Sequence, residues 1–367
     1  MDEQLDAVVI GAGIVGLAVA RALALAGREV LVLERHALPA QETSSRNSGV
    51  IHSGIYYPTG SLKAQLCMSG RARLYEFLDQ RGVAHQRCGK LIVAQEGQQQ
   101  ALEALQRQAV LNGVTDLVPL SADGVREYEP AVSCARGLWC PSTGIVDVHE
   151  LAQALIADLE AAGGSIAYRS LVHSAQVGAK TARLLCQSGG EQSTLECRLV
   201  INSAGLDAVG LLHAFSGYPA RLLRTARFAK GNYFSLTGAK PFRHLVYPMP
   251  NEAGLGIHAT LDLDGSTRFG PNVEWVEKPE YAVDPRHAAE FYDSIRSYWP
   301  ELAQGALQPG YAGVRPKLVG PGEKSADFVI EGPQVHGCKG LVNLLGIESP
   351  GLTSCLAIGE YVVSSLD

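Results

Sequence analysis

The first forty residues alternate between short apolar runs and polar or glycine-rich turns. Ala7–Ile10 is apolar and rich in β-branched residues, which predicts a buried strand, and the Ala- and Leu-rich segment Leu17–Ala26 predicts a helix that Gly27 ends. A second apolar run, Glu29–Leu33, predicts another strand that ends at Glu34. The chain therefore begins as strand, helix, strand, the order of a parallel α/β unit.

Helical spacing of apolar residues recurs in three later segments, at about 62–81, 149–162 and 353–365. The last of these segments follows an apolar strand pattern at Gly340–Gly346. The chain therefore ends as it begins, with a strand, a glycine-containing turn and a helix. This repetition predicts that both ends contribute to one α/β domain.

The strand patterns between these helices are of two kinds. One kind lies at 165–168, 177–187 and 195–202. Its fully apolar run Leu199–Ile201 is typical of a buried parallel strand. Residues 221–317 instead carry short alternating stretches, such as Asn232–Leu236 and Leu255–Thr260, between frequent Pro and Gly. That region predicts a large antiparallel sheet.

Composition and charge narrow the classes of protein. At 367 residues, 46% hydrophobic and 19% charged, the chain is a compact folder with room for two domains or one two-lobed unit. Its 31 basic and 37 acidic residues give a net charge of −6, so no positive field attracts nucleic acid. The eight cysteines form no C-x-x-C pair, which argues against zinc and is typical of a reducing cytoplasm. The few residues before the first apolar run are acidic, so we expect no export signal.

The turn after the first strand is Gly11-Ala12-Gly13-Ile14-Val15-Gly16, a G-x-G-x-x-G sequence. Gly11 permits the tight turn, Gly13 lets the backbone approach a pyrophosphate, and Gly16 lets helix and strand pack closely. Glu34 stands where an acid accepts hydrogen bonds from an adenosine ribose. Strand, turn, helix, strand and acid occur in register, and together they predict dinucleotide binding.

The next segment favours FAD over NAD as the dinucleotide. An NAD enzyme would continue with βαβ units, whereas Thr43–Tyr57 is polar, interrupted by glycine and aromatic at its end. Small hydroxyl and amide side chains beside an arginine suit a loop that crosses a pyrophosphate and a flavin. An ordinary capping loop before the helix at 62–81 is the alternative.

These residues resemble a known family. Ser44–Tyr57, Ser61–Ala64 and Cys88–Ala94 are similar to the L-2-hydroxyglutarate dehydrogenase branch of the D-amino-acid-oxidase superfamily of FAD-dependent oxidoreductases. Shorter matches lie at Thr143–Asp147, Ala204-Gly205, Tyr247-Pro248, Phe269–Asn272 and Glu348–Thr353. The resemblance runs from about residue 6 to residue 365.

The resemblance implies an α/β and α+β fold, in which a Rossmann-like FAD-binding domain is interleaved with an antiparallel-sheet substrate domain. The expected FAD-binding domain comprises residues 1–80, 145–215 and 310–367, and the expected substrate-binding domain comprises residues 81–144 and 216–309. We expect the substrate between the flavin and the antiparallel sheet, because ligand sites concentrate where two lobes meet.

The motif and the resemblance together predict the FAD contacts. The first α/β unit contributes Gly11, Gly13, Ile14, Val15, Gly16, Glu34 and Arg35. The polar segment contributes Ser44, Ser45, Arg46, Asn47, Ser48, Val50, Ile51 and His52. The rest of the chain adds Val172, Ala204, Gly205, Gly313, Arg315, Glu348, Ser349, Pro350, Gly351, Leu352 and Thr353. No metal is expected.

Oxidation of an alcohol needs a base for the hydroxyl proton besides the flavin that accepts the hydride. His52 is the first candidate, because it directly follows the flavin loop and an imidazole can be neutral at working pH. The alternatives for His52 are a structural hydrogen bond to the flavin or a covalent flavin link. His258 lies in an alternating strand pattern and resembles a family histidine, which makes it the second candidate.

A 2-hydroxy acid also needs its carboxylate held, and the planar fork of arginine suits that task. Arg315 stands where the resembled superfamily places its carboxylate-binding arginine; a solvated surface arginine is the alternative. Lys230 and Asn232 stand where the 2-hydroxyglutarate enzymes usually carry an arginine and an acid. A dicarboxylate would need a second cation, Lys230 or Arg268, and Tyr247 could add a hydroxyl donor or simply pack.

The sequence thus predicts an FAD-dependent dehydrogenase or oxidase that converts a small L-2-hydroxy acid, most like L-2-hydroxyglutarate, into the 2-oxo acid. A flavin-dependent amino acid or amine oxidase is the nearest alternative; a catalytically silent flavoprotein and an NAD-dependent dehydrogenase are two others. The expected partners are a small carboxylate substrate and an electron acceptor, which could be oxygen, a quinone or a redox protein. We expect a cytoplasmic protein, and the resemblance allows peripheral association with the inner face of the membrane.

Overall fold

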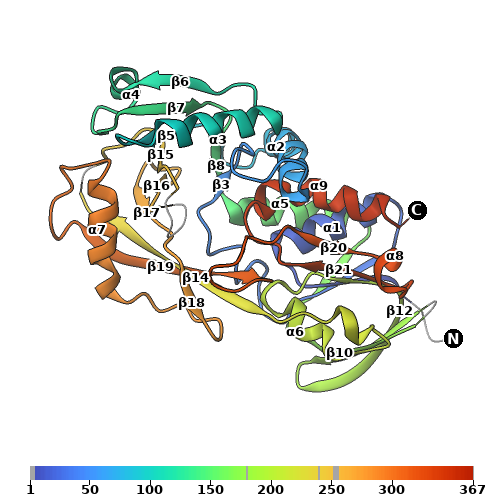
Figure 1. Ribbon diagram of the computed structural model, residues 1–367. Helices are drawn as coiled ribbons and strands as arrows, with labels where there is room; N and C mark the ends of the chain where they lie inside the picture. The colour runs from blue at the N-terminus through green and yellow to red at the C-terminus, as the bar shows by residue number, and fades with distance from the viewer. Residues whose placement is uncertain (1–4, 179–180, 239, 251–255, 367) are drawn as a thin grey trace.

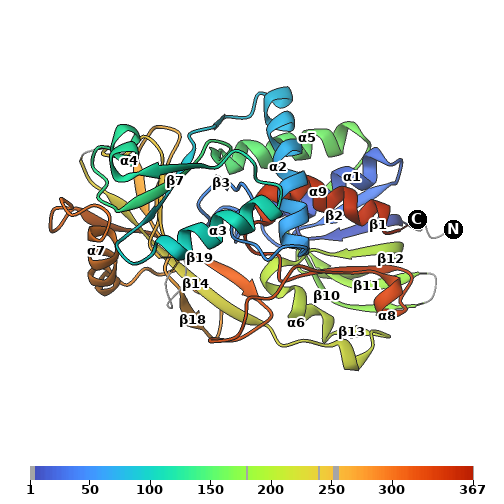
Figure 2. The same ribbon diagram turned by 45° about the horizontal axis from the view of Figure 1, so that its top comes forward.

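The computed structural model describes residues 5–178, 181–238, 240–250 and 256–366. Two lobes lie side by side, each built on a large β-sheet (Figure 1). The first strand and the last helix of the described chain belong to the same lobe, and the segments of the other lobe are inserted between them (Figure 2). The polypeptide therefore crosses between the lobes several times.

The first sheet has nine strands. Its path runs β13 (Phe215–Ser216), β10 (Ser170–Val177), β11 (Ala182–Ser188), β12 (Glu191–Asn202), β1 (Leu5–Ile10), β2 (Val30–Leu33) and β9 (Ser165–Ala167), with β21 (Leu341–Leu345) beside β12 and β20 (Val329–Glu331) beside β21. Strands β9, β2, β1, β12 and β21 are parallel to their neighbours in this group. Residues Ala7–Ile10 of β1 are buried at its centre, as their apolar run predicts.

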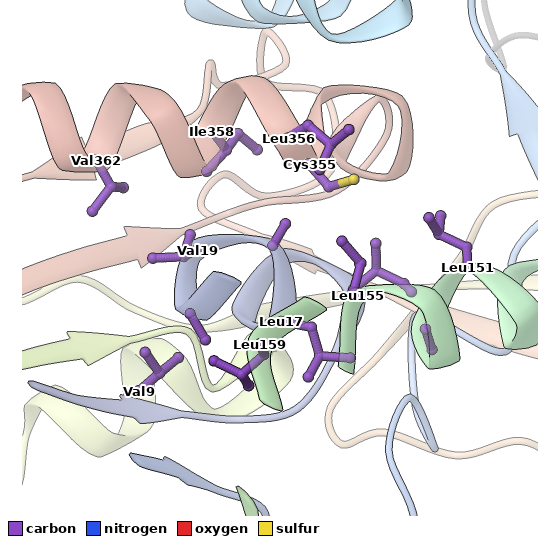
Figure 3. Close-up of a cluster of buried hydrophobic side chains, with 14 of the residues drawn as sticks. Val9, Leu17, Val19, Leu151, Leu155, Leu159, Cys355, Leu356, Ile358 and Val362 are labelled. Carbon is purple, nitrogen blue, oxygen red and sulfur yellow. The ribbon is translucent and has the colours of Figure 1, made fainter. Parts of the chain in front are cut away.

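Helices of this lobe pack on one another through small and apolar side chains. They are α1 (Ile14–Leu25), α2 (Leu62–Arg81), α5 (Val148–Ala161) and α9 (Gly351–Ser364). Leu17, Leu155 and Ile358 point from α1, α5 and α9 into a common core (Figure 3). Each such buried side chain stabilises the fold by roughly 1.5–3 kcal/mol. A Cβ on Gly359 would lie 2.7 Å from the Ala18 carbonyl oxygen, so this glycine allows α9 to approach the backbone of α1.

The second sheet also has nine strands and is antiparallel except for the pair β5 and β15. Its path runs β18 (Glu274–Val276), β14 (Arg227–Leu236), β17 (Thr267–Phe269), β16 (Ala259–Leu261), β15 (Leu245–Pro248), β5 (Lys90–Ala94), β7 (Arg136–Cys140) and β6 (Val118–Ser121), with β19 (Leu307–Lys317) beside β14. A three-stranded sheet joins β3 (Val50–Ile51), β8 (Gly144–Val146) and β4 (His85–Gln86). The remaining helices are α3 (Gln99–Leu111), α4 (Ala122–Tyr128), α6 (Ala208–Leu212), α7 (Ala288–Arg296) and α8 (Pro333–His336).

The predicted fold class is confirmed: a parallel α/β sheet and a large antiparallel sheet alternate along the chain. The helices predicted at 62–81, 149–162 and 353–365 are α2, α5 and α9, with ends that differ by two residues at most. Helix α1 begins at Ile14, three residues before its predicted start, because the end of the glycine turn is already helical.

Two predicted strands need correction. The pattern at 177–187 is not one strand, because Val177 ends β10 and Ala182 begins β11, and the Gly178 N–H donates to the Thr181 carbonyl (3.1 Å) within the turn. In the pattern predicted at 255–260, Leu255 lies outside the described residues and β16 begins only at Ala259. His258 therefore precedes the strand rather than lying within it.

The predicted domain boundaries stay a prediction, although the sheets can be compared with them. Strands within 5–33, 165–216 and 329–345 belong to the first sheet, and strands within 90–140 and 227–317 belong to the second. The predicted boundary at 310 falls inside β19, which pairs with β14 as far as Lys317. The second sheet thus extends seven residues beyond that boundary.

Candidate active site

The turn between β1 and α1 has no room for a side chain at two of its glycines. Gly11 adopts φ +101°, and a Cβ there would lie 2.7 Å from the Ser203 carbonyl oxygen. A Cβ on Gly16 would lie 2.1 Å from the Gly11 carbonyl oxygen. Helix α1 therefore starts directly against the strand, and its first N–H groups lack partners within the helix; that of Ile14 donates to Ser44 Oγ (3.0 Å). Such a helix end suits a phosphate.

Glu34 follows β2 beside this turn and is 6% exposed. The Ala12 N–H donates to its Oε2 and the His36 N–H donates to its Oε1, both at 2.8 Å. Two backbone donors fix the carboxylate, and each oxygen keeps a lone pair for a further donor such as a ribose hydroxyl. Glu34, the acid predicted after the second strand, can therefore accept a hydrogen bond from the ribose of a nucleotide.

A cavity of about 370 Å³ opens at this edge of the first sheet, where the carboxyl ends of β1, β2 and β12 meet. The predicted cofactor residues in its wall are Gly11, Gly13, Glu34, Arg35, Ser44, Val172, Ala204 and Gly205. Arg35 forms ion pairs there with Glu42 and Asp207. We call this space the smaller cavity.

A larger cavity, of about 710 Å³, adjoins the smaller one and is lined by residues of both lobes. The walls of the two cavities share Gly13, Thr43, Ser44, Ser203 and Gly205. The predicted site residues in the larger wall are Ile14, Val15, Gly16, Arg46, Asn47, Ser48, Val50, His52, Tyr247, His258, Gly313, Arg315, Glu348, Ser349, Pro350, Gly351 and Leu352. FAD fits this arrangement, because its phosphates can lie at the shared helix end, its adenosine by Glu34 and its ring in the larger cavity.

Three predicted cofactor residues line neither cavity. The Ser45 hydroxyl donates to the Glu42 carbonyl (3.2 Å) within a turn. Ile51 is fully buried in β3, and Thr353 is fully buried in the first turn of α9, where its Oγ1 accepts the His52 N–H (2.9 Å). These residues hold the neighbouring segments in place instead of facing the cofactor.

Lys230 lines neither the smaller nor the larger cavity. Gly231 and Tyr233 of β14 line the larger cavity, and since side chains alternate along a strand, Lys230 points to the other face. Its ammonium forms ion pairs with Glu280 (3.0 Å) and Glu274 (3.5 Å). Its charge is therefore already matched by the protein.

His52 lies just after β3 in the wall of the larger cavity. Its Nε2 is 3.2 Å from Ser349 Oγ, in the turn that leads into α9. Burial, and secondly the charge of Lys90, lowers the pKa of His52 to about 3. The imidazole is therefore neutral near pH 7, and one of its ring nitrogens carries no proton.

Tyr247 of β15 and His258 stack on each other in the same wall, with ring centroids 3.5 Å apart and planes inclined by 11°. Burial raises the pKa of Tyr247, so its hydroxyl stays protonated and can donate a hydrogen bond. The structure thus brings both predicted histidines and the predicted tyrosine to one cavity. Which histidine takes the proton stays a prediction.

Arg315 of β19 also faces the larger cavity. Its two terminal nitrogens each lie 3.3 Å from the Asn272 carbonyl oxygen, and no carboxylate in the described ranges pairs with it. A Cβ on Gly231 would lie 3.0 Å from Nη2, so this glycine makes room for the guanidinium. Arg315 keeps donors for a ligand carboxylate, whereas Arg268 is already paired with Asp262.

Three residues that sequence reasoning did not select belong to this region. Tyr233 lines the cavity, and its hydroxyl lies 3.0 Å from Ser48 Oγ. Tyr56 lines it too, and the Lys90 ammonium lies 4.8 Å from the centroid of that ring. The sequence does contain an indication of Lys90, because a lysine that begins the apolar run Lys90–Ala94 is expected to be a buried charge.

A buried ion cluster completes the wall beside the start of α9. Lys63 lies 3.0 Å from Glu348 Oε1, and Lys317 lies 2.7 Å from Glu348 Oε2. Burial alone would raise the pKa of Glu348, but the two ammonium groups lower it overall. The cluster holds two cations and one anion, so it leaves one positive charge beside the cavity.

These features define a class: a two-lobed dinucleotide-binding enzyme whose second lobe covers one end of the cofactor cavity. A family model described as FAD dependent oxidoreductase matches residues 6–365, and the chain belongs to this family. The chain is 41% identical to the mitochondrial L-2-hydroxyglutarate dehydrogenase of Arabidopsis thaliana over 99% of this chain and 83% of the relative. It is 31% identical to the L-2-hydroxyglutarate dehydrogenase of Escherichia coli (strain K12), over 98% and 93% of the two chains.

Solved structures agree with this family. An L-α-glycerophosphate oxidase from Mycoplasma pneumoniae, reduced with dithionite and with FAD bound, has a TM-score of 0.89 at 25% identity, over 99% of this chain and 95% of that one. A glycine oxidase from Geobacillus kaustophilus has a TM-score of 0.81 at 18% identity, over 99% and 94%, and shares the fold. The predictions of FAD as cofactor and of an FAD-dependent oxidoreductase are thereby confirmed.

The described part of the chain contains neither a membrane-spanning helix nor a cluster of metal ligands. Within the described ranges, no helix is long and apolar enough to cross a membrane. The same residues contain no group of three or more His, Cys, Asp or Glu side chains that could hold a metal ion.

Proposed function

We propose that this enzyme oxidises the C2 hydroxyl of a small L-2-hydroxy acid, of the L-2-hydroxyglutarate type, to the 2-oxo acid. The observation that carries the proposal is the presence of Arg315 and His52 in one cavity, the first a guanidinium with no carboxylate partner among the described residues and the second a neutral imidazole. The names of the relatives in Arabidopsis thaliana and Escherichia coli support the substrate class.

Arg315 would hold the carboxylate next to the reacting carbon. Its planar fork offers two parallel N–H donors, and its only hydrogen-bond partner in the described part of the chain is the Asn272 carbonyl. The tyrosine and histidine rings in the cavity wall would strengthen this attraction by lowering the local dielectric constant around the bound carboxylate. The substrate would therefore enter with its hydroxyl-bearing carbon in a defined orientation.

His52 would accept the hydroxyl proton at its unprotonated ring nitrogen, while the bound flavin supplies the hydride acceptor. Ser349 Oγ lies 3.2 Å from Nε2 and can hold the imidazole plane in one orientation. His258, stacked on Tyr247, is the second candidate for the base. The Tyr247 hydroxyl stays protonated and would donate to the substrate oxygen.

Anaerobic reduction of the flavin tests this function. The purified holoenzyme is mixed under argon with L-2-hydroxyglutarate, D-2-hydroxyglutarate, L-lactate, glycine, L-proline and L-glutamate, and the absorbance of the oxidised flavin is followed. We expect L-2-hydroxyglutarate to bleach the flavin and the three amino acids to leave it oxidised. Bleaching by an amino acid instead would indicate a flavin amine oxidase, and no bleaching by any acid would indicate a silent flavoprotein.

His52→Gln separates the two base candidates in the same assay. If His52 takes the proton, His52→Gln reduces the flavin about 10²–10⁴-fold more slowly at pH 7, the usual contribution of a general base, and His258→Gln slows it less. The reverse order would assign the base to His258. The flavin content of each purified variant is measured first, so that loss of cofactor is not mistaken for loss of the base.

The acceptor of the electrons and the location of the enzyme stay predictions. Oxygen, a quinone or a redox protein would each serve as acceptor, and oxygen consumption during turnover distinguishes the first from the others. Our prediction is a cytoplasmic enzyme, and the family resemblance allows peripheral association with the inner face of the membrane. The relatives from Arabidopsis thaliana and Homo sapiens carry the word mitochondrial in their names, so the organelle is the alternative that fractionation must test.

A further inference from the structure

A buried lysine beside the larger cavity adds to the effect of burial on the pKa of His52 and has no other role in the reaction described above. Lys90 begins β5 and is 1% exposed. Its ammonium lies 4.8 Å from the ring centroid of Tyr56 and 4.8 Å from that of Tyr247. Both rings line the cavity, so the positive charge lies immediately beside the cavity wall.

The described residues supply no acidic partner for this lysine. Among the residues that the structure describes, no carboxylate lies within ion-pair distance of Lys90. The nearby thiol of Cys67 is not an anion, because burial raises its pKa to about 12, and burial also raises the pKa values of Tyr56 and Tyr247. Burial lowers the pKa of Lys90, because a buried ammonium without an anion is costly, and an anion brought by a ligand would favour the charged form.

Most other basic side chains near the cavity already have acidic partners. Lys63 and Lys317 share Glu348, and Lys230 and Arg268 are paired with carboxylates away from the cavity. The two cations predicted as second anchors for a dicarboxylate are therefore both committed to other partners.

Arg46 is exposed to the larger cavity but belongs to its cofactor end. Its guanidinium lies 4.4 Å from the centroid of the Tyr281 ring. Tyr281 is in turn close enough to Arg35, Glu42 and Asp207 for their charges to affect its pKa, and these three residues line the smaller cavity. Besides the net positive charge of the Lys63–Glu348–Lys317 cluster, Arg315 and Lys90 are therefore the cations beside the larger cavity that have no carboxylate partner among the described residues and lie away from its cofactor end.

A row of tyrosines connects these two cations. Arg315 and Tyr233 lie on the paired strands β19 and β14 and both line the cavity. Tyr247 and Lys90 lie on the paired strands β15 and β5, and the Lys90 ammonium is 4.8 Å from the Tyr247 ring centroid. Tyr233 and Tyr247 of the cavity wall therefore have one cation at the Arg315 side and one at the Lys90 side. A short chain with a carboxylate at each end matches this distribution of charge.

We propose that Lys90 is the second cationic anchor of the active site: it attracts the distal carboxylate of a dicarboxylate 2-hydroxy acid whose 2-hydroxy carboxylate is held by Arg315. This inference rests on the proposed function and names the residue that selects a dicarboxylate over a monocarboxylate of equal chain length. The phenol rings of Tyr56 and Tyr247 shield the ammonium from water until the substrate enters.

The first test compares two substrates that differ only at the distal end. The values of kcat/KM for L-2-hydroxyglutarate and L-2-hydroxypentanoate are measured for the wild type, Lys90→Met and Lys230→Met. We expect Lys90→Met to lower kcat/KM for L-2-hydroxyglutarate about 10- to 100-fold, as for the loss of one hydrogen bond or ion pair to a charged group, and to change that for L-2-hydroxypentanoate less than about threefold. Lys230→Met, which also removes a buried lysine, should not change the ratio of the two values.

A second test needs no turnover. Glutarate and pentanoate are titrated into the oxidised holoenzyme, and their Kd values are read from the perturbation of the flavin absorbance. Lys90→Met should raise the Kd of glutarate about tenfold or more and leave the Kd of pentanoate unchanged. Flavin content and melting temperature are recorded for each variant; if Lys90→Met binds no flavin, Lys90→Gln removes the same charge with a polar end group and is used in its place.

The outcomes separate the two proposals. The inference is wrong if Lys90→Met lowers kcat/KM equally for both substrates and raises Kd equally for glutarate and pentanoate. Lys90 would then act on the histidines or on the fold and would not be an anchor. If neither kcat/KM nor Kd changes, the inference is wrong as well. If the wild type oxidises no 2-hydroxy acid, the proposed function fails, while the glutarate and pentanoate titrations still decide the role of Lys90.

Discussion

The two cavities of the enzyme satisfy their polar groups in different ways. In the smaller cavity the protein supplies the partners: Glu34 accepts two backbone N–H groups, and Arg35 is paired with Glu42 and Asp207. In the larger cavity, Arg315 donates only to a backbone carbonyl within the described chain. The polar groups of the smaller cavity are therefore already arranged for a permanently bound cofactor. The larger cavity keeps charged groups and hydrogen-bond donors for a substrate that binds and dissociates.

The two cavities also differ in where their residues come from. Most of the smaller wall is supplied by residues 10–44 and by the ends of strands that pair directly with β1. The larger wall draws on residues from Gly13 to Leu352 and on both lobes. A change in the smaller cavity should therefore affect cofactor retention, and a change in the larger one should affect the substrate first.

The largest effect is expected at the glycine turn. Gly16→Ala would place a Cβ 2.1 Å from the Gly11 carbonyl oxygen, so strand and helix must separate where the phosphates bind. We expect the flavin content of the purified protein to fall about tenfold or more, because such overpacking moves the backbone. The ratio of flavin to protein absorbance measures this.

Gly124→Ala is the matched control for this change. A Cβ there makes only ordinary contact, 3.4 Å from Leu120 Cδ2, in a helix of the other lobe. The control should keep its flavin. A full flavin content in Gly16→Ala would show that the close approach is not needed to hold the cofactor.

The next effect concerns the carboxylate anchor of the larger cavity. Arg315→Met should lower kcat/KM for L-2-hydroxyglutarate about 10²- to 10³-fold, because it removes a bidentate charged donor, and Arg315→Lys should recover only part of the loss. Flavin content should stay near that of the wild type, in contrast to Gly16→Ala. Kinetics and flavin absorbance together test both statements, and an Arg315→Met variant with normal kcat/KM would place the anchor elsewhere.

A smaller effect is expected in the pH dependence of stability. Burial lowers the pKa of His52 to about 3 from an unfolded value of 6.5. Between these two pH values the unfolded chain binds a proton at His52 and the folded protein does not. The stability that His52 contributes as a neutral group is fully present above pH 6.5. It is lost as the pH falls toward 3, by up to about 1.4 kcal/mol per pH unit.

This dependence can be measured against His52→Gln, which cannot titrate. The unfolding free energy of the wild-type holoprotein should decrease relative to that of His52→Gln as the pH is lowered from 7 to 4.5. A constant difference over this range would mean that His52 titrates alike in the folded and unfolded protein, and that it is not buried as described.

The smallest effect concerns an unpartnered hydroxyl of the larger cavity. The Tyr56 hydroxyl is buried and has no hydrogen-bond partner in the described ranges, so Tyr56→Phe should change the unfolding free energy by less than about 0.5 kcal/mol. In the matched control Tyr298→Phe, the lost hydroxyl donates to the Ile257 carbonyl (3.0 Å), and the change should cost about 1 kcal/mol. Equal losses in urea unfolding would show that Tyr56 has a partner in the folded protein.

Much of the smaller cavity could be predicted from the sequence, because its parts are close together in the chain. Gly11, Gly16 and Glu34 stand at spacings that only one local geometry satisfies, and periodicity located α2, α5 and α9 within two residues. The orientation of Lys230 could not be predicted in this way. Its identity suggests an anchor, but the face of β14 on which it lies depends on how that strand pairs with β19.

The amino-acid sequence by itself indicated the phosphate turn, because that turn depends on local spacing and short-range backbone geometry, and it indicated the family and FAD through the resemblance of its motifs to known enzymes. Only the tertiary structure decided which charges face the substrate. Lys90 and Lys230 are both buried lysines in strands. Lys230 is paired with Glu274 and Glu280, whereas Lys90 has no carboxylate partner among the described residues and lies beside the rings of Tyr56 and Tyr247. The physical reason is that the cost of a buried charge depends on neighbours that are distant in the chain, and folding alone brings those neighbours together.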